Sequence, residues 1–386
     1  MAEALSLHSK QVLAANQKDI QKSTEKGSAF IDRLSLQQGR LQNCIEDMRA
    51  IASLPDPVGE VIEEKTYNEL HFCKKRVPIG VLGVIYEARP NVTIDIATLA
   101  FKTGNSVILR GSSETLETNQ AIVNAFQEAL CDFPCAIQLI TTPDRAAVTQ
   151  LLKMDAYIDM IIPRGGYALH QFCKEHSTIP VITGGIGICH LFVEASAKFI
   201  PSVEVIVNAK TQRPSVCNAL DTLLVEESIA KTFLPAAVKA LQEKGVTFVL
   251  DEKAWNLLDT EREKNPNHFR KAQEADWKTE WLSLTLGIKI VESIEYAIQH
   301  IQKYSSKHSD GILSEDKKQI ERFVSAIDTA CLYINASTRF TDGGQFGFGA
   351  EVAISTQKLH ARGPMGLKEL TSYKWIVQGN YTVRGS

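Results

Sequence analysis

One cysteine of this chain, Cys217, lies in a short polar stretch that also carries positive charge. Lys210 and Arg213 precede it by seven and four residues. A thiolate is the nucleophilic form of cysteine, and nearby cations lower the pKa that sets how much thiolate is present. The stretch therefore predicts a covalent step in which the sulfur attacks an electrophilic carbon. The alternative is a free cysteine that packs as a small hydrophobic side chain, as most free cysteines do.

Two other stretches could bind an anion, because each places an Arg-Gly pair at the end of an apolar run. They are Arg110-Gly-Ser-Ser113 and Pro163-Arg-Gly-Gly166. Glycine lets the backbone approach a pyrophosphate closely, and free N–H groups at the start of a helix favour anions. Neither has the Gly-x-Gly-x-x-Gly spacing, so each alone also fits an ordinary turn. Together they predict a dinucleotide site, to which we assign Arg110, Ser112, Ser113, Pro163, Arg164, Gly165 and Gly166.

The elements that must hold these stretches alternate between strand and helix from Pro78 to Glu175. We expect strands at 78–86, 106–109, 136–140 and 158–162, and helices at 92–102, 114–130, 144–153 and 167–175. Such regular alternation predicts an α/β fold with a doubly wound parallel sheet, which binds ligands beyond the carboxyl ends of its strands.

A second α/β lobe is predicted around and after Cys217. A helix should end near Val207, and the apolar run 220–225 should be a buried strand. The remaining expected elements are strands at 246–250, 287–291, near 311 and at 331–335, and helices at 229–242, 292–304 and 316–327. The charged stretch 251–278 is predicted to be a solvated surface insertion.

The two ends of the chain differ from these lobes. Residues 1–52 should be helical, and residues 61–77 should form an exposed hairpin. An exposed hairpin is marginally stable alone, so it should pair with another subunit. The strand-like tail 373–383 could supply such a partner strand from a neighbour, which predicts a homo-oligomer. The glycine-rich segment 341–351 cannot form a regular helix and is expected to wrap a ligand.

Composition excludes several classes of function. The chain has 386 residues, 44% of them hydrophobic and 23% charged, which is typical of a globular protein of two or three lobes. Its net charge of −3 gives no reason to expect nucleic acid or membrane as a partner. The N-terminus lacks a signal-peptide pattern, and the eight scattered cysteines suit a reducing cytoplasm. Cys131 and Cys135 have no second ligand pair, so no metal site is predicted.

Five motifs in order resemble one known family. They are Val77-Pro-Ile-Gly-Val-Leu-Gly-Val-Ile-Tyr-Glu-Ala-Arg-Pro-Asn-Val92, Pro163-Arg-Gly-Gly166, Gln212-Arg-Pro-Ser-Val-Cys-Asn218, Asn335-Ala-Ser-Thr-Arg-Phe-Thr-Asp-Gly-Gly344 and His360-Ala-Arg-Gly-Pro-Met-Gly366. This set, spread over nearly the whole chain, is similar to the gamma-glutamyl phosphate reductases, the proline-biosynthesis branch of the aldehyde dehydrogenase superfamily.

The resemblance implies an aldehyde dehydrogenase-like fold in three parts. An NADP-binding domain would comprise residues 1–55 and 80–211, and a catalytic domain residues 212–370. Residues 56–79 and 371–386 would form a small β oligomerisation arm. The implied cofactor is NADP(H), and the implied reaction is reduction of L-glutamyl 5-phosphate to L-glutamate 5-semialdehyde and phosphate through a thioester on Cys217. The glutamate 5-kinase that supplies the substrate is a possible partner. The alternatives are a non-phosphorylating semialdehyde dehydrogenase and a non-catalytic scaffold for that kinase.

The resemblance also implies roles for further residues. The backbone N–H of Cys217 and the amide of Asn91 would stabilise the oxyanion. Arg89 is the alternative to Asn91 as the second donor. Asn91 could instead cap the helix that begins near Val92. Glu280 would bind a ribose of the cofactor. Ser337, Thr338 and Arg339 would hold the amino-acid end of the substrate, although Arg339 could instead form an interlobe ion pair.

Two departures from the superfamily pattern carry predictions. Hydrolytic members have a glutamate that activates water before a Leu-Gly-Gly triplet, whereas the similar stretch here is Ile182-Thr-Gly-Gly185, without a carboxylate. A phosphorylating enzyme is therefore favoured. NAD-using members carry a Lys-Pro-Ala-Glu type sequence where this chain has Arg110 to Ser113, which predicts a preference for NADP because a repulsive carboxylate is absent.

Overall fold

The computed structural model describes residues 1–384, except for the side chains of residues 28 and 29. The chain divides into two compact units, the first formed by residues 1–183, 343–353 and 364–386 and the second by residues 184–342 and 354–363. The boundary expected at 211/212 is therefore wrong, and residues 184–211 join the second unit. Residues 385–386, the end of the expected oligomerisation arm, lie outside the described residues.

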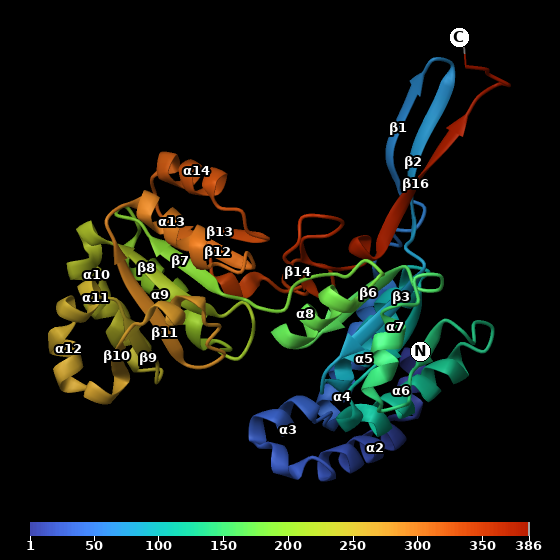
Figure 1. Cartoon of the computed structure of the whole chain (residues 1–386), viewed down its shortest axis with the longest axis horizontal. Coiled ribbons are helices and arrows are strands. Elements are labelled where there is room, and N and C mark those ends of the chain that lie inside the picture. The colour runs from blue at the N-terminus through green and yellow to red at the C-terminus, as the bar shows by residue number, and fades with distance from the viewer. Residues whose placement is uncertain (385–386) are drawn as a thin grey trace. The chain divides into compact units, whose positions relative to one another are not determined.

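The first unit is built on a four-stranded parallel sheet in the order β5-β4-β3-β6 (Figure 1). Its strands are β3 (Val81–Tyr86), β4 (Ser106–Arg110), β5 (Ile137–Leu139) and β6 (Met160–Arg164). Its helices are α1 (Ala2–Leu7), α2 (Ser9–Gln21), α3 (Ser28–Leu34), α4 (Gln38–Ser53), α5 (Pro90–Lys102), α6 (Leu116–Ala129), α7 (Arg145–Leu151) and α8 (Tyr167–His176). The predicted alternation and the helical N-terminus are thus confirmed.

Apolar runs explain why these strands are central. Leu82, Val84 and Ile162 are fully buried, because helices cover both faces of a parallel sheet. Between the sheet and α7, Ile85 and Ile161 pack with Leu151 in one apolar cluster. The carboxyl ends of β3, β4 and β6 consequently carry the turns that the sequence singled out.

The predicted hairpin also belongs to the first unit. Strands β1 (Val61–Tyr67) and β2 (Leu70–Pro78) are antiparallel, and the C-terminal strand β16 (Thr371–Gln378) pairs with the other edge of β2 (Figure 1). The expectation that the tail pairs with a neighbour's hairpin is therefore wrong, since β16 completes the sheet of its own chain. Tyr373, Trp375 and Ile376 of β16 remain exposed.

The second unit contains a seven-stranded parallel sheet in the order β10-β9-β11-β8-β7-β12-β13. The strands are β7 (Cys189–Val193), β8 (Leu220–Glu226), β9 (Thr247–Leu250), β10 (Phe269–Lys271), β11 (Thr285–Val291), β12 (Ser309–Leu313) and β13 (Cys331–Ile334). The helices are α9 (Phe199–Thr211), α10 (Glu227–Gln242), α11 (Glu252–Leu257), α12 (Asp259–Lys264), α13 (Ile294–Tyr304) and α14 (Lys317–Ala326). Two short strands, β14 (Ile354–Ser355) and β15 (Gly363–Pro364), follow.

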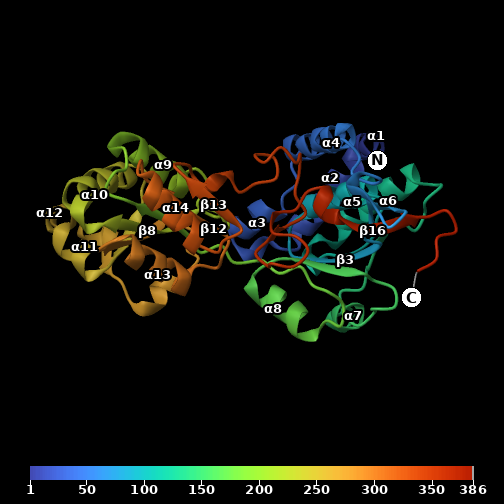
Figure 2. The ribbon, with the colours of Figure 1, turned by 90° about the horizontal axis from the view of Figure 1, so that it is seen from above.

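Helices cover both faces of this sheet, with α10 and α13 on opposite sides of β8 (Figure 2). Leu223 of β8 packs in the cluster with α9 and α10, whereas its neighbour Leu224 packs in the cluster with α13 and α14. In α13, residues Ile294, Ala297, Ile298 and Ile301 are buried at helical spacing. This alternation along the strand and periodicity along the helix made both elements predictable.

Two features of the second unit were not predicted. Strand β7 is fully buried between β8 and β12. Because β7 belongs to this sheet, the segment that precedes Cys217 also belongs to the second unit. The charged stretch 251–278 is not merely a solvated insertion, because it contributes strand β10 to the sheet and buries Trp277. No helix within residues 1–384 is long and apolar enough to cross a membrane.

Candidate active site

Cys217 lies on the loop that connects α9 to β8 in the second unit. The α9 helix ends at Thr211 and β8 begins at Leu220, so the loop stands at the amino edge of the sheet. Cys217 is half-buried, whereas the cysteines at 44, 173, 189 and 331 are buried. Partial exposure on a loop between two rigid elements is what a reactive thiol requires.

The backbone of Cys217 is locked by the segment that leads into β7. The thiol of Cys189 donates a hydrogen bond to the carbonyl oxygen of Cys217, with the sulfur and oxygen 3.2 Å apart. Gly187 lies against the same carbonyl so closely that a Cβ there would stand 1.6 Å from its oxygen. Only glycine permits this approach, so the position of the Cys217 peptide depends on Gly187.

Arg339 joins this loop from a distant part of the chain. It lies in a 3₁₀ turn, Thr338–Phe340, after β13. Its Nε donates to the side-chain oxygen of Gln212 at 2.8 Å, and its Nη1 donates to Oδ1 of Asn218. Because Asn218 directly follows Cys217, a half-buried guanidinium is held between two residues of the loop 212–219, which we call the nucleophile loop after the role predicted for Cys217. The pairing is within the second unit, so the expected alternative of an interlobe ion pair has no support.

Asn218 also forms hydrogen bonds with the residues on either side of Arg339 in the chain. Its amide donates to the carbonyl of Thr341 at 2.7 Å, and the hydroxyl of Thr338 donates to the carbonyl of Asn218 at 2.7 Å. The hydroxyl of Ser337 accepts the N–H of Arg339 at 3.3 Å. Both hydroxyls belong to buried residues and are engaged in these bonds, so within this segment the half-buried guanidinium is the charged group that reaches the loop.

Lys210 does not supply the cation expected beside Cys217. It is fully buried, and its ammonium donates to the carbonyl of Leu220 at 2.8 Å. Burial lowers the pKa of Lys210, and the nearby Asp221 opposes that shift. Asp221 in turn accepts N–H groups from Trp281 and Cys189. Lys210 thus stabilises the start of β8, whereas Arg213 remains exposed on the loop.

Glu280 lies before β11 and faces the same segment. One of its carboxylate oxygens accepts the N–H of Gly187 at 2.9 Å. Burial raises the pKa of Glu280, and the bond from Gly187 opposes the shift. A carboxylate has a second oxygen that can accept a hydroxyl donor, which is the chemistry that a ribose would supply.

Asn91 belongs to the first unit and lies in the first turn of α5. The helix begins at Pro90 with Arg89 as its N-cap residue, so the alternative that Asn91 caps the helix is wrong. The Asn91 amide donates to Asp95 at 3.2 Å. Burial raises the pKa of Asp95 to about 7, against the effect of that bond. An amide carries two N–H groups, so one remains for another acceptor.

The turn after β4 differs from its sequence-based description. Arg110 is buried, and its guanidinium donates to the carbonyls of Gly111, Pro143 and Asp144. Burial lowers its pKa. These bonds tie the turn to the start of α7, so much of the donor capacity of Arg110 is already used.

A carboxylate overlooked in the sequence, Glu114, directly follows Ser113 and accepts its hydroxyl at 3.2 Å. Although burial raises the pKa of Glu114, the hydrogen bond and charge of Lys26, together with hydrogen bonds from the Glu114 backbone and from Ser112, bring it down to about 2. The turn therefore carries an ionised glutamate after all, but one whose charge Lys26 neutralises.

The turn after β6 suits close approach of an anion. A Cβ at Gly166 would meet no atom within 4 Å, and Gly166 is the N-cap of the ten-residue helix α8. The N–H of Gly166 donates to the carboxylate of Glu87 at 3.1 Å, so this position already attracts negative charge. Gly165 is crowded by Glu87 and Leu169, which explains the glycine there. The open space at Gly166 leaves room for an anion, and the carboxylate of Glu87 would have to release the N–H before an anion could accept it.

Comparisons with known proteins agree with this geometry. The sequence pattern of the aldehyde dehydrogenase family matches residues 9–255. The gamma-glutamyl phosphate reductase of Photobacterium profundum is 53% identical, and the match covers 100% of this chain and 92% of that protein. The same-named protein of an Escherichia coli strain is 52% identical, with 100% and 93% covered. The crystal structure of gamma-glutamyl phosphate reductase from Thermotoga maritima has a TM-score of 0.95 at 46% identity, with 100% and 92% covered. This chain belongs to the aldehyde dehydrogenase family, in its gamma-glutamyl phosphate reductase branch.

The resemblance drawn from five motifs is therefore confirmed, and so is the aldehyde dehydrogenase-like fold. Sequence reasoning nevertheless missed the residues that organise the nucleophile loop of this aldehyde dehydrogenase: Gly187, Cys189, Gln212 and Asn218. Gln212 and Asn218 flank the cysteine within the quoted motif. Side-chain amides at both ends of a loop could have indicated that the loop is bound by a hydrogen-bonding partner from elsewhere in the chain. Nothing local indicated their partner.

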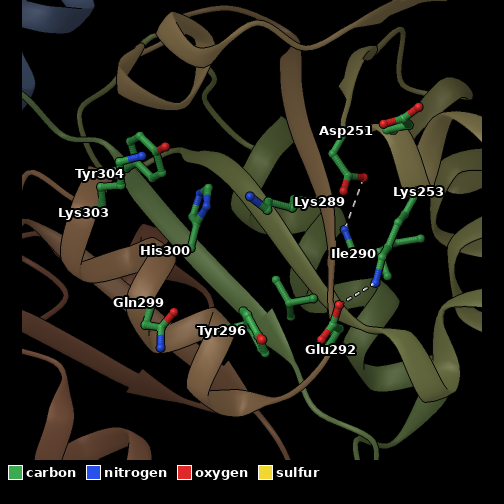
Figure 3. Close-up of a pocket in the computed structure, with 12 residues that line it drawn as sticks. Asp251, Lys253, Lys289, Ile290, Glu292, Tyr296, Gln299, His300, Lys303 and Tyr304 are labelled. Atoms are coloured by element: carbon green, nitrogen blue, oxygen red, sulfur yellow. Dashed lines mark hydrogen bonds and ion pairs between the residues drawn. The ribbon is translucent and has the colours of Figure 1, made fainter.

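The second unit also has a hollow of about 340 Å³ above β11, between α11 and α13 (Figure 3). None of the predicted site residues of this aldehyde dehydrogenase lines it. Its lysines are largely matched by carboxylates, since Lys253 pairs with Glu227 and Glu292 and Lys303 pairs with Glu274. Burial lowers the pKa of His300, which faces Lys289 in Figure 3, to about 2. The hollow therefore lacks a reactive group, and we assign it no part in the chemistry.

Proposed function

We propose that this protein catalyses the NADPH-dependent reduction of L-glutamyl 5-phosphate to L-glutamate 5-semialdehyde and phosphate, a step of proline biosynthesis. The observation that carries the proposal is the half-buried Cys217 on a loop clamped to Arg339. A thiol for covalent chemistry and a guanidinium for an anionic substrate are what this reaction needs. The names and full-length identity of the relatives support the same substrate.

The chemistry begins with the Cys217 thiolate, which attacks the acyl carbon of glutamyl phosphate. A carbon–sulfur bond forms, the carbon–oxygen bond to phosphate breaks with its electron pair on phosphate, and a thioester remains. NADPH, when bound, supplies the hydride that reduces the thioester carbon. The resulting alkoxide expels the thiolate and releases the aldehyde, which restores Cys217.

Negative charge develops on the carbonyl oxygen in both steps, so N–H donors directed at it accelerate the reaction. We assign the backbone N–H of Cys217 and the second N–H of the Asn91 amide to this role. The close approach of Gly187 and the hydrogen bond from Cys189 hold the Cys217 peptide in place. Ser337 and Thr338 contribute by holding the turn that carries the substrate-binding Arg339.

The cofactor residues follow from the two strand-end turns. We assign the pyrophosphate to Pro163, Arg164, Gly165 and Gly166, a ribose to Glu280, and the adenosine end to Arg110, Ser112 and Ser113. Preference for NADP is supported by the cations around the turn after β4, which carries Arg110, Ser112 and Ser113. Lys26 neutralises Glu114, and Arg145 at the start of α7 is exposed and lies within electrostatic range of Arg110. A 2′-phosphate placed there would meet net positive charge.

We further propose that the enzyme works in the cytoplasm as a homo-oligomer and can receive its unstable substrate from the glutamate 5-kinase. The exposed aromatic and aliphatic side chains of β16 and of its neighbours in the three-stranded sheet support self-association.

The decisive experiment runs the reaction in the oxidative direction. NADP reduction by glutamate 5-semialdehyde is followed with and without phosphate, with arsenate as an analogue. We expect activity only when one of these anions is present, because Ile182 stands where hydrolytic members carry the water-activating glutamate. An equal rate at zero phosphate would contradict the proposal and favour a hydrolytic dehydrogenase.

A further inference from the structure

Two guanidinium groups stand at the nucleophile loop of the second unit. Arg213 is exposed and lies four residues before Cys217 on the same loop. Arg339 reaches the loop from the turn after β13 and is bonded to Gln212, the neighbour of Arg213, and to Asn218, the neighbour of Cys217. The hydrogen bonds of Gln212 and Asn218 thus hold the second cation beside the first and beside the thiol.

Among the described residues, ion pairs do not neutralise the charge of these two arginines, although the field of Asp342 partly offsets it. Within residues 1–384 neither guanidinium forms an ion pair, and Asp342 is the carboxylate whose field acts on Arg339. Burial lowers the pKa of Arg339, and the charge of Arg213 lowers it further, so the two cations repel each other. Two like charges on neighbouring side chains, one of them fixed by the amides of Gln212 and Asn218, are stabilised when an anion binds between them.

The geometry points to the phosphate group as that anion. We propose that Arg213 and Arg339 form the phosphate site of the reaction, which holds the leaving phosphate during reduction and the attacking phosphate during oxidation. This inference rests on the proposed function. It replaces the expectation that Arg339 holds the amino-acid end of the substrate.

The chemistry of the reaction favours the phosphate group of the substrate over its α-carboxylate as the ligand of the two arginines. The phosphate is one oxygen atom away from the carbon that Cys217 attacks, whereas the α-carboxylate lies at the far end of the glutamyl chain. As the carbon–oxygen bond breaks, its electron pair moves onto phosphate, so charge grows next to Cys217 and two guanidinium forks can stabilise it. In the reverse direction a phosphate oxygen attacks the thioester, and the electron pair of the carbon–sulfur bond returns to the sulfur.

A first test needs neither cofactor nor substrate. Cys217 of the full-length protein is alkylated with iodoacetate, which is an anion, and with iodoacetamide, its neutral analogue of nearly equal size. The ratio of the two rates cancels differences in thiolate content. We expect the parent to favour iodoacetate, and inorganic phosphate to suppress that preference competitively. Arg213→Ala and Arg339→Ala should each lower the ratio about tenfold and weaken the effect of phosphate.

Controls separate a local site from a general charge effect. Arg322→Ala removes the same charge from an exposed position on α14 of the same unit and should leave the ratio unchanged. Arg339→Lys keeps the charge without the planar fork and should retain an intermediate ratio. If Arg339→Ala fails to fold, the exposed Arg213 still provides the test. The proposal is overturned if the unsubstituted protein reacts no faster with iodoacetate than with iodoacetamide. It is also overturned if inorganic phosphate does not change the ratio of the two rates.

A second test uses the oxidative reaction. We expect the KM for phosphate to rise about ten- to a hundredfold in Arg213→Ala and Arg339→Ala, while the KM for the semialdehyde changes little. The opposite pattern would show that the arginines hold the carboxylate and overturn this inference. Phosphate-independent oxidation by the parent, in contrast, would refute the proposed function itself, so the two failures are distinguishable.

Discussion

Gly187→Ala is the substitution whose effect follows most directly from the structure. The added Cβ would stand 1.6 Å from the carbonyl oxygen of Cys217 and 2.9 Å from its Cα. Real contacts of this kind do not fall below 3.0 Å, so backbone must move. Gly187 itself cannot yield easily, because its N–H is bonded to Glu280 and the N–H of Ile188 is bonded to Ser306.

The movement must therefore displace the Cys217 peptide by roughly 1 Å or more, and a misplacement of about 1 Å at a reacting group costs about a hundredfold in rate. Overpacking of this kind also costs about 1 to 3 kcal/mol of folding free energy, which a folded protein of this size tolerates. We accordingly expect kcat/KM to fall at least about a hundredfold, with a lowered Tm but an intact fold.

The assay is NADP reduction by glutamate 5-semialdehyde at saturating phosphate, together with the alkylation rate of Cys217 by iodoacetamide and a thermal melt. Gly39→Ala is the matched control, because a Cβ at Gly39 meets nothing within 4 Å, and it should keep full activity. A folded Gly187→Ala protein whose activity stays close to that of the parent would refute the argument that Gly187 positions the nucleophile.

Four further predictions concern other parts of the chain. Cys217→Ala should lower turnover by several orders of magnitude without unfolding the protein. Six of the other cysteines should each be replaceable, whereas Cys189→Ala loses the hydrogen bond to the Cys217 carbonyl and should lower turnover by less than Cys217→Ala does; turnover and circular dichroism of the eight variants check this. Removal of residues 373–386 should yield monomers or aggregate, because the edge of β2 loses its partner β16, and light scattering that shows an unchanged oligomer would count against it. Ser113→Glu should weaken binding of 2′,5′-ADP, measured by calorimetry, more than binding of 5′-AMP, since a second carboxylate would repel the 2′-phosphate; equal losses would contradict the NADP assignment. Finally, burial lowers the pKa of His300 to about 2, so the unfolded chain takes up a proton below about pH 6.5 that the folded chain does not, and folding stability is lost as the pH falls. His300→Gln should remove about 2 kcal/mol of the difference in unfolding free energy between about pH 8 and about pH 5, measured by urea denaturation, and an unchanged difference would show that His300 is protonated in the folded state.

Local sequence patterns were sufficient to predict the fold class and most elements of both sheets. The strands of a parallel sheet are buried on both faces, so each appears in the sequence as a continuous apolar run. Leu223 and Leu224 of β8, which pack on opposite faces, are neighbours in such a run. The five motifs likewise identified the family, because they are contiguous stretches. Cys217 could be proposed as the nucleophile for the same reason, since its polar loop is read directly from neighbouring residues.

Long-range packing, by contrast, sets which groups surround that cysteine. Arg339 is bonded to Gln212 and Asn218 across 127 and 121 residues of sequence, a pairing that no local pattern encodes. Lys210, close in sequence, is instead buried against the Leu220 carbonyl, since the last turn of α9 directs its side chain into the protein. The unit boundary differs from the expected one for a similar reason, because β7 joins the second sheet through hydrogen bonds to β8 and β12. Periodicity along a chain reports how much of each residue is buried, whereas the identity of its partners depends on how distant segments pack.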